Sequence, residues 1–329
     1  MAQVKLRWGI IGTGKIAASF AADLQHAKNC QLVAVASRTR DAAEAFGERF
    51  AIPHRHASYA SLAEDPQVDV AYIATPNTQH HENSALCLQA GKAVLCEKPF
   101  TLNAREAAAL IGLARQKGLF LMEAMWTRFL PALEEVRRLL RDGALGEPHL
   151  LTADFGRRFR FNRASRLFAP ELGGGALLDL GVYPVSLASL VFGPPARISS
   201  MATLGSTGVD EQEGILLGYD GGRLAILTAS MQTTTPEEAT ICGTQGLLRI
   251  HSPMHAPSRI TLIPEDGKPR TSGHAIRGNG LHYQAEEVAR CLREGLLESD
   301  RMRLEESLQV MQTMDTLRAQ WGLRYPGEH

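Results

Sequence analysis

Hydrophobic and polar residues follow two different patterns along the first third of the chain. Short, nearly continuous apolar runs predict buried strands, and apolar residues that recur with a period near 3.6 predict helices between them. The expected strands are Leu6–Ile11, Gln31–Ala36, Val68–Ala74, Ala93–Cys96 and Leu119–Glu123. The expected helices are Ile16–Ala27, Asp41–Phe50, Glu82–Ala90 and Asn103–Lys117, the last with a capping box (Asn103, Glu106) and a terminal Gly118. This alternation predicts βαβ units and a parallel sheet.

The pattern changes near residues 143–146. From His149 to about Ile263 most of the chain predicts strands separated by turns, including a hairpin at Thr240–Ile250. The expected helices in this part are near Asp179–Val191, Tyr283–Leu297 and Leu304–Trp321. Because strand follows strand without a helix between them, we expect a mainly antiparallel sheet. The sequence therefore predicts an α/β protein with two domains, residues 1–123 and 124–329.

Composition narrows the function classes. The chain has 35 basic and 35 acidic residues, a net charge of zero, which argues against binding to nucleic acid or to an anionic membrane. Its 329 residues exceed the usual size of a single core, in agreement with two domains. No CxxC pair occurs among the five cysteines, so we expect neither a disulfide framework nor a metal site. We also expect no membrane span and a cytoplasmic location.

A glycine motif follows the first expected strand directly. Gly12 permits a tight turn, Gly14 lets the backbone approach a pyrophosphate, and Ala17 takes the place of the third glycine of a dinucleotide-binding fingerprint. Thr13, Lys15 and Ile16 complete the turn and open the helix, whose N-terminus offers free N–H groups to an anion. The alternative is an ordinary turn, because Gly-x-Gly sequences are common.

The second expected strand ends in a sequence that favours NADP over NAD. An NAD site usually has a carboxylate here for the ribose 2′-hydroxyl, whereas this chain has Ser37 and Arg38. A hydroxyl and a guanidinium can hold a 2′-phosphate through charge-assisted hydrogen bonds. The alternative is a solvated loop with incidental arginines.

Two further motifs follow expected strands. Thr75, Pro76, Asn77 and His80 form a polar turn at the carboxyl end of a strand, where such turns face the cofactor crevice. Asn77 and His80 are candidates to contact the nicotinamide half, although a surface histidine at a helix start is an equal alternative for His80. The tripeptide Glu97-Lys98-Pro99 follows the next strand and would place Lys98 in the same crevice.

The fourth motif is the glycine-rich stretch Gly173–Tyr183. Asp179 and Tyr183 are four residues apart, so one helical turn would present both on one face. The three glycines allow the backbone to pass close to another surface or a ligand. A glycine hinge before a packing helix, with Tyr183 as a hydrogen-bonded core residue, is the alternative.

Together these motifs resemble the glucose–fructose oxidoreductase, inositol dehydrogenase and MocA (Gfo/Idh/MocA) family, across both domains. Ala93–Pro99, Leu119–Phe129 and Gly173–Tyr183 are closer still to its dimeric dihydrodiol dehydrogenase branch. The resemblance implies an N-terminal Rossmann domain, a C-terminal α+β domain with a large open sheet, and a homodimer through that sheet. It also implies NADP-linked oxidation or reduction of a secondary alcohol in a trans-dihydrodiol, cyclic diol or sugar. Tyr183 departs from the histidine common in the wider family but agrees with this branch.

The resemblance assigns Lys98 and Tyr183 to proton transfer and Asp179 to orienting the substrate or the catalytic pair. A free tyrosine with a pKa near 10 is rarely ionised at pH 7, a penalty of about 4 kcal/mol. A nearby lysine cation and the positive nicotinamide ring would both favour the phenolate. We interpret Tyr183 as the acid/base and Lys98 as its electrostatic partner, the two meeting over one nicotinamide. Because they would titrate together, the sequence does not say which holds the proton.

The substrate-binding wall and the rival functions complete the expectations. Trp126, Phe155 and Phe159 follow the ends of expected strands and suit the apolar side of a ring, with core packing as the alternative. The basic stretch Arg157–Arg163 would meet an anionic substrate group or pair with acids at a dimer contact. The rival functions are a non-catalytic NADP and metabolite sensor, a sugar-ketone reductase, and a glycosidase that uses NAD transiently.

Overall fold

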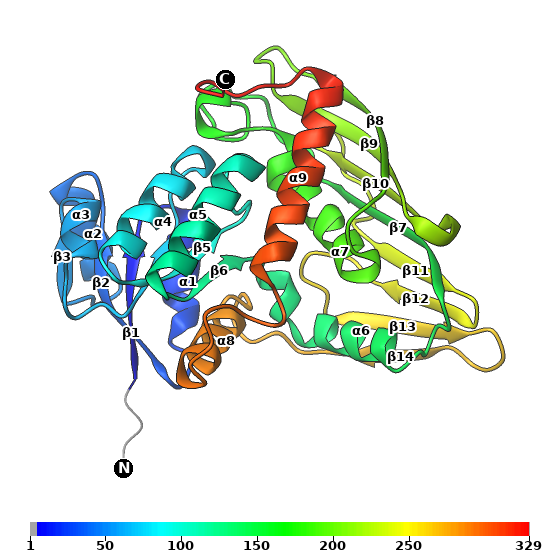
Figure 1. Cartoon of the computed structure of the whole chain (residues 1–329), viewed down its shortest axis with the longest axis horizontal. Coiled ribbons are helices and arrows are strands. Elements are labelled where there is room, and N and C mark those ends of the chain that lie inside the picture. The colour runs from blue at the N-terminus through cyan, green and yellow to red at the C-terminus, as the bar shows by residue number, and fades with distance from the viewer. Residues whose placement is uncertain (1–4, 329) are drawn as a thin grey trace. The chain divides into compact units, whose positions relative to one another are not determined.

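The computed structural model describes residues 5–328, which divide into two compact units. The first unit contains residues 5–129 together with Arg277–Leu308. Its six strands form one parallel sheet, sheet A, in the order β3-β2-β1-β4-β5-β6 (Figure 1). The strands are β1 (Leu6–Ile11), β2 (Cys30–Ala36), β3 (His54–His56), β4 (Val70–Ile73), β5 (Ala93–Glu97) and β6 (Leu121–Ala124). This is the strand order of a doubly wound dinucleotide-binding fold.

Helices on sheet A explain the apolar runs in its strands. β4 and β5 are buried at every position, as expected for strands with both faces covered. The helices of this part are α1 (Lys15–Leu24), α2 (Arg40–Arg49), α3 (Tyr59–Ala63), α4 (His80–Gln89), α5 (Ala104–Lys117) and the 3₁₀ turns η1 (Asn77–Gln79) and η2 (Trp126–Phe129). The predicted capping box is present, because the Asn103 side chain accepts a hydrogen bond from the Glu106 N–H at 3.0 Å and α5 ends at Gly118 with φ +62°.

The first unit takes part of its structure from the far end of the chain. We predicted a first domain of residues 1–123 only, whereas Arg277–Leu308, with helix α8 (His282–Arg293), also belongs to this unit. The Asp23 carboxylate on α1 accepts hydrogen bonds from the backbone N–H groups of Asn279 (2.9 Å) and Leu281 (2.8 Å). A carboxylate buried in this way needs donors, and residues more than 250 positions away supply them.

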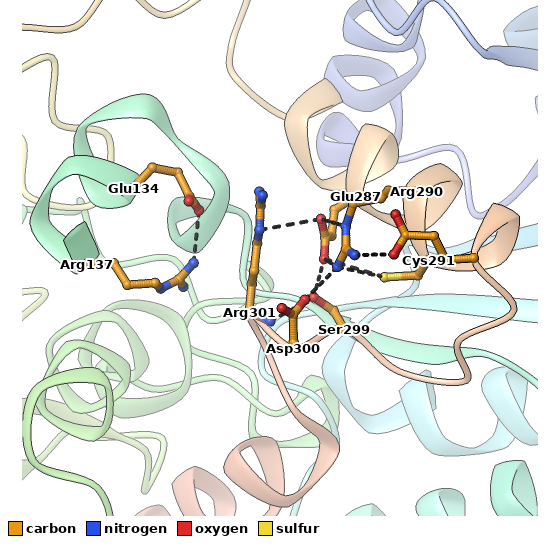
Figure 2. Close-up of polar contacts among 9 residues, drawn as sticks. Glu134, Arg137, Glu287, Arg290, Cys291, Ser299, Asp300 and Arg301 are labelled. Atoms are coloured by element: carbon orange, nitrogen blue, oxygen red, sulfur yellow. Dashed lines mark hydrogen bonds and ion pairs between the residues drawn. The ribbon is translucent and has the colours of Figure 1, made fainter. Parts of the chain in front are cut away.

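A polar cluster joins α8 to the loop that follows it (Figure 2). Glu287 is 3% exposed and accepts hydrogen bonds from the Arg290 guanidinium (2.7 Å) and the Ser299 hydroxyl (2.5 Å). Burial alone would raise the pKa of this carboxyl, but the hydrogen bonds from Arg290 and Ser299 outweigh it and lower the pKa. The cluster therefore stabilises the fold of the segment Arg277–Leu308 itself.

The second unit contains Leu130–Ile276 and residues 309–328. Its eight strands form sheet B in the order β14-β13-β12-β11-β7-β10-β9-β8, antiparallel except for the parallel pair β7 and β10. The strands are β7 (Pro148–Gly156), β8 (Arg197–Leu204), β9 (Asp210–Gly218), β10 (Leu224–Ser230), β11 (Ala239–Gly243), β12 (Gly246–Ile250), β13 (Arg259–Pro264) and β14 (Arg270–Gly273). The helices are α6 (Pro131–Arg141), α7 (Val182–Phe192) and α9 (Leu304–Trp321), which begins in the first unit, with the short turns η3 (Pro170–Leu172), η4 (Leu177–Gly181) and η5 (Asp220–Gly222). The mainly antiparallel sheet and the hairpin of β11 and β12 agree with prediction.

The two faces of sheet B differ in what covers them. Helix α7 and the turn before it pack against the inner face, which carries buried residues such as Leu227 and Ile215. On the outer face, Ile226 of β10 lies directly across from Leu216 of β9, and these side chains are 46% and 43% exposed. Met201 of β8 is 81% exposed on the same face. Neighbouring strands thus present an apolar outer surface.

One stretch among the described residues resembles a membrane span by length and composition. Within Pro170–Phe192, a window of 18 residues has a mean hydropathy of 1.6, and 72% of that window is buried inside the protein. We expected no apolar run of this length. The difference arises because two short turns and α7 follow one another as the central layer beneath sheet B, where an all-round apolar helix is required.

Candidate active site

The predicted glycine turn joins β1 to α1 as expected from the motif. Gly12 has φ +106°, and a Cβ at this position would lie 2.6 Å from the Ala74 carbonyl oxygen. A glycine is therefore required for the packing of this turn against the end of β4. Gly14 differs, because a Cβ there would meet no protein atom within 4 Å. Gly14 thus borders open space at the start of α1.

The N-terminus of α1 meets the chemical needs of a pyrophosphate. Gly14 is the N-cap residue, no side chain caps the helix, and its first turn contains no acidic residue. Its N–H groups and the helix dipole are therefore directed to the space beside Gly14, with Lys15 as the exposed first residue of the helix and Ile16 next to it. These features fit a dinucleotide cofactor, which supplies the hydride-transfer chemistry when it is bound.

The end of β2 lies beside the same turn. The hydroxyl oxygens of Thr13 and Ser37 are 3.3 Å apart, so the glycine turn and the residue after β2 are in direct contact. Arg38 is exposed, and the side chain of the following Thr39 caps α2 through the Ala42 N–H at 3.4 Å. The side chains expected to recognise a ribose are therefore the Ser37 hydroxyl and the exposed Arg38 guanidinium.

His80 is an internal residue of the first unit. Its side chain is buried, 1% exposed, so it is not a surface histidine. Nδ1 lies 2.8 Å from the Pro99 carbonyl oxygen and Nε2 lies 3.0 Å from the Thr75 carbonyl oxygen. Carbonyl oxygens only accept hydrogen bonds, so the imidazole links the loops that follow β4 and β5. His80 therefore positions the two loops that carry the predicted cofactor contacts.

The other residues of these two loops divide into buried and accessible positions. Thr75 and Asn77 are buried, and the Thr75 hydroxyl accepts a hydrogen bond from the Asn83 amide at 3.3 Å, whereas Pro76 is half-buried. Glu97 is also buried and accepts hydrogen bonds from the Tyr72 hydroxyl and from the Lys98 N–H (3.2 Å). The Glu97 carboxylate therefore accepts hydrogen bonds from within the protein, and one of them fixes the backbone at Lys98.

The glycine-rich stretch of the second unit packs closely on the protein itself. A Cβ on Gly174 would lie 2.7 Å from the Leu167 carbonyl oxygen, and one on Gly175 would lie 2.2 Å from the Asp210 carboxylate. Asp210 is fully buried, and it accepts a hydrogen bond from the Leu177 N–H at 2.6 Å. The glycines thus let Asp210 reach the start of the following helical segment, as in the hinge alternative above.

Asp179 and Tyr183 lie in one continuous helical segment, but it is not a regular α-helix. η4, which contains Asp179, is a π-turn, and Tyr183 is the second residue of α7. π-turns occur frequently at functional sites because they realign neighbouring side chains. Asp179 accepts a hydrogen bond from the Arg166 guanidinium at 2.9 Å, an ion pair that we did not predict.

Two rings pack against Tyr183 in the second unit. The Phe155 ring lies 5.5 Å from the Tyr183 ring between centroids, and the His255 ring lies 5.6 Å from it. The structure therefore brings the predicted Phe155 and Tyr183 together. No sequence signal points to His255, which lies far along the chain and outside any motif.

The remaining predicted residues lie elsewhere in their own units. Trp126 is the half-buried first residue of η2 in the first unit. Phe159 is half-buried after β7, where its N–H donates to the Met231 carbonyl at 2.9 Å. Within the basic stretch, Arg157 pairs with the buried Glu237 at 3.2 Å, while Arg158 and Arg163 are exposed. Part of the stretch is therefore an ion pair within this unit, and its role at a dimer contact stays a prediction.

His54, His56 and Asp65 form a cluster of potential metal ligands at the edge of sheet A. The Asp65 Oδ2 atom lies 2.6 Å from His54 Nδ1 and 3.0 Å from His56 Nε2. Two ligands on a tetrahedral zinc ion are separated by about 3.3 Å, given zinc–ligand distances near 2.0–2.1 Å. The observed separations are those of hydrogen bonds, and this cluster joins β3 to the end of α3.

Comparison with known proteins agrees with this geometry. Residues 6–125 match the family described as "Oxidoreductase family, NAD-binding Rossmann fold", and residues 133–249 match the "GFO/IDH/MocA C-terminal domain". The chain is similar to the trans-1,2-dihydrobenzene-1,2-diol dehydrogenase of Xenopus tropicalis, with 39% identity across 97% of this chain and 99% of the relative. The enzyme of that name from Mus musculus is 39% identical across 98% of both chains.

Solved structures show the same architecture. A 3-ketoreductase from Actinomadura kijaniata in complex with NADP and TDP-benzene has a TM-score of 0.82 and 28% identity, covering 96% of this chain and 97% of its own. An aldose-aldose oxidoreductase from Caulobacter crescentus has a TM-score of 0.87 at 23% identity, covering 97% and 98% of the two chains, and so shows the fold alone. The protein is a dehydrogenase or reductase that acts on CH–OH groups. The chain belongs to the Gfo/Idh/MocA oxidoreductase family.

Proposed function

We propose that the protein transfers hydride between NADP and a secondary alcohol or ketone of a cyclic diol, of the trans-dihydrodiol type, or of a sugar. The observation that carries this proposal is the setting of the Tyr183 phenol, at the start of α7 directly after the π-turn η4 and against the Phe155 and His255 rings. A phenol held against aromatic rings suits proton exchange with an alcohol on a largely apolar ring. The relatives named dihydrodiol dehydrogenase support the diol class.

The preference for NADP rests on the end of β2. Ser37 and the exposed Arg38 are the first two residues after the strand, and both suit a 2′-phosphate. The first acidic residue after β2 is Asp41, inside the first turn of α2. The Actinomadura kijaniata 3-ketoreductase is described with NADP. Steady-state rates with NADP and NAD at equal concentrations test this preference directly.

For the chemistry, we propose that Tyr183 exchanges a proton with the substrate hydroxyl and that Lys98 favours the ionised phenol. Asp179, held by Arg166 at 2.9 Å, would orient the substrate or the catalytic pair. Loss of the general acid or base usually costs about 10²–10⁴ in rate. Replacement of Tyr183 by Phe should lower kcat within this range in both directions. Unchanged turnover would contradict the role of Tyr183 and make Lys98 the candidate base.

The substrate class can be tested with a panel of cyclic diols, pentoses and keto-sugars, read at the absorbance of reduced nicotinamide. Oxidation of trans-dihydrodiols would support the diol assignment. Reduction of keto-sugars alone would favour a sugar-ketone reductase, and the 28% identical Actinomadura kijaniata enzyme is named a 3-ketoreductase. A panel with no net absorbance change would contradict the proposed reaction.

We also propose that the protein is a homodimer through the outer face of sheet B. This face carries exposed Met201, Leu216, Leu224 and Ile226 on three adjacent strands. Contiguous apolar surface of this kind on a folded protein is typical of an interface. A second copy of the chain would cover it by isologous contact, in which the same patch serves both subunits.

A further inference from the structure

His255 and Glu237 form a polar pair beside Tyr183. His255 lies between β12 and β13, and its ring is stacked on the Phe155 ring at 4.4 Å with an interplanar angle of 12°. The same ring lies 5.6 Å from the Tyr183 ring. The Glu237 carboxylate lies on the other side, with Oε2 at 3.9 Å from His255 Nδ1. A carboxylate, an imidazole and a phenol thus follow one another within the second unit.

The backbone at Glu237 is held in an unfavourable conformation that directs this carboxylate. Glu237 has φ +56°, a left-handed conformation that is unfavourable for a residue other than glycine. The Asp154 carboxylate accepts a hydrogen bond from the Glu237 N–H at 2.6 Å, and the Glu237 carbonyl accepts one from the Met254 N–H at 2.8 Å. The second bond ties Glu237 to the residue immediately before His255. Such strain persists where the surrounding contacts over-determine it, and it concentrates at functional sites.

Arg157 completes the arrangement and accounts for part of the basic stretch. Its guanidinium lies 3.2 Å from the Glu237 carboxylate and 5.6 Å from the centre of the Phe155 ring. Glu237 is only 7% exposed, so a buried carboxylate of this kind requires a charged or hydrogen-bonding partner. Arg157 supplies a positive charge beside the Glu237 carboxylate, which also faces His255.

We propose that Glu237 and His255 are positioning residues that favour loss of the proton from the Tyr183 phenol. This inference rests on the function proposed above, because it concerns the same proton transfer. The groups that face His255 include Glu237 from the segment before β11, Tyr183 from α7 and the uncharged Phe155 from β7, with Arg157 beside Glu237.

We take His255 as the cation, with the Glu237 carboxylate as its counter-charge at 3.9 Å. The positive ring then favours the phenolate of Tyr183 by charge. The pair thus keeps more of the phenol in the ionised form, which accepts a proton during alcohol oxidation. Its removal should therefore raise the pH at which oxidation becomes fast.

The test uses His255→Phe and Glu237→Gln in the full-length protein, with pH profiles of kcat and KM for oxidation by NADP. His255→Phe keeps a ring to stack on Phe155 and removes both nitrogens. We expect kcat at neutral pH to fall about tenfold, the half-maximal pH of kcat to move upward by about one unit, and KM to change little. Glu237→Gln should move the profile in the same direction by a smaller amount.

His251→Phe is the matched control. His251 lies four residues earlier. Its Nδ1 atom lies 3.7 Å from Glu238 Oε1, and its Nε2 atom forms a hydrogen bond of 2.8 Å with the Thr261 hydroxyl. The His251→Phe variant therefore loses a contact with a glutamate and a polar contact, as His255→Phe does. It should keep the wild-type pH profile. A wild-type profile and kcat in His255→Phe, or an equal shift in His251→Phe, would overturn the inference while leaving the proposed function intact. Absence of turnover in the unmodified protein would instead contradict the proposed function. If His255→Phe does not fold, Glu237→Gln alone decides, because a profile identical to wild type contradicts the pair.

Discussion

The carbonyl oxygen of Ala74 lies against the α-carbon of Gly12, where an added Cβ would be only 2.6 Å away. This contact joins the glycine turn after β1 to the end of β4, the two neighbouring strands between which sheet A changes its winding direction. Ligands of doubly wound folds bind at this place. The turn is therefore fixed by packing before any cofactor binds.

The first prediction separates the packing role of one glycine from the binding role of the other. Gly12→Ala should strongly destabilise the first unit, by several kcal/mol, because the new Cβ meets backbone and φ is +106°. Gly14→Ala should preserve the thermal midpoint, since its Cβ meets no protein atom within 4 Å, but should weaken NADP binding. Thermal unfolding and cofactor titration measure the two effects. Equal midpoints for the two variants would contradict this division.

The second prediction concerns cofactor choice. Arg38→Gln should lower kcat/KM for NADP by about tenfold to a hundredfold and change the value for NAD little, because only NADP carries the 2′-phosphate. Arg40→Gln is the control, since the Arg40 guanidinium lies 3.5 Å from Glu44 on α2 and is engaged there. Rates with both cofactors provide the comparison. A parallel loss with NAD would show that Arg38 supports the fold rather than the phosphate.

The third prediction addresses the outer face of sheet B. Ile226→Lys places a charge in the middle of the exposed apolar surface and should convert the proposed dimer to a monomer, because burying an unpaired charge is costly. Sedimentation or light scattering gives the mass. Leu297→Lys is the control in the first unit, where Leu297 is 48% exposed, and it should leave the mass unchanged. A wild-type protein of monomeric mass would refute the proposed dimer itself.

The fourth prediction follows from a buried carboxyl. Burial raises the pKa of Glu123 on β6 to about 7, and the nearby Ser307 hydroxyl and Arg128 guanidinium only partly oppose this effect. The folded state then binds the proton more tightly than the unfolded state, so the stability contributed by the protonated form is lost as pH rises toward and through 7. Relative to Glu123→Gln, the wild-type protein should lose on the order of 3 kcal/mol of unfolding free energy between pH 5 and pH 8.

Glu287 provides the control with the opposite sign. Its pKa is lowered by the hydrogen bonds from Arg290 and Ser299, which exceed the effect of burial. The stability that it contributes is therefore present above the ordinary pKa of a glutamate and disappears as pH falls. Glu287→Gln should be destabilised at neutral pH, with a gap to wild type that narrows in acid. Denaturant unfolding across pH measures both variants, and a constant gap for either would contradict the assignment.

Elements with strong local signals could be predicted from the sequence. The apolar runs of sheet A, the Asn103 capping box and the hairpin of β11 and β12 appear where expected, because periodicity and turn chemistry are local properties. The short elements β3 and α3 were missed, since a three-residue strand made of His54, Arg55 and His56 has no apolar pattern. The π-turn at Asp179 was also missed, because its spacing differs from that of an α-helix by one residue.

Pairings between distant residues could not be predicted. Tyr183 was expected near the site because it belongs to the glycine-rich stretch, and Phe155 because it follows the end of an expected strand. The contacts that His255 and Glu237 make there depend on the order of strands in sheet B. His80 was named from its place after a strand, but its contacts with Thr75 and Pro99 depend on two loops folding together. Single-sequence patterns report local conformation, and these contacts are made by tertiary packing.

The return of Arg277–Leu308 to the first unit has a consequence for biosynthesis. The hydrogen bonds to the Asp23 carboxylate can form only after Asn279 and Leu281 have been synthesised. The hydrogen bond of 3.1 Å from the Leu121 N–H to the Leu297 carbonyl oxygen likewise forms only after Leu297 has been added. A ribosome adding about 5–20 residues each second therefore completes the second unit's sheet before the nucleotide-binding unit has all of its parts. The first unit thus begins the chain but receives its last segment only after every strand of sheet B has been made.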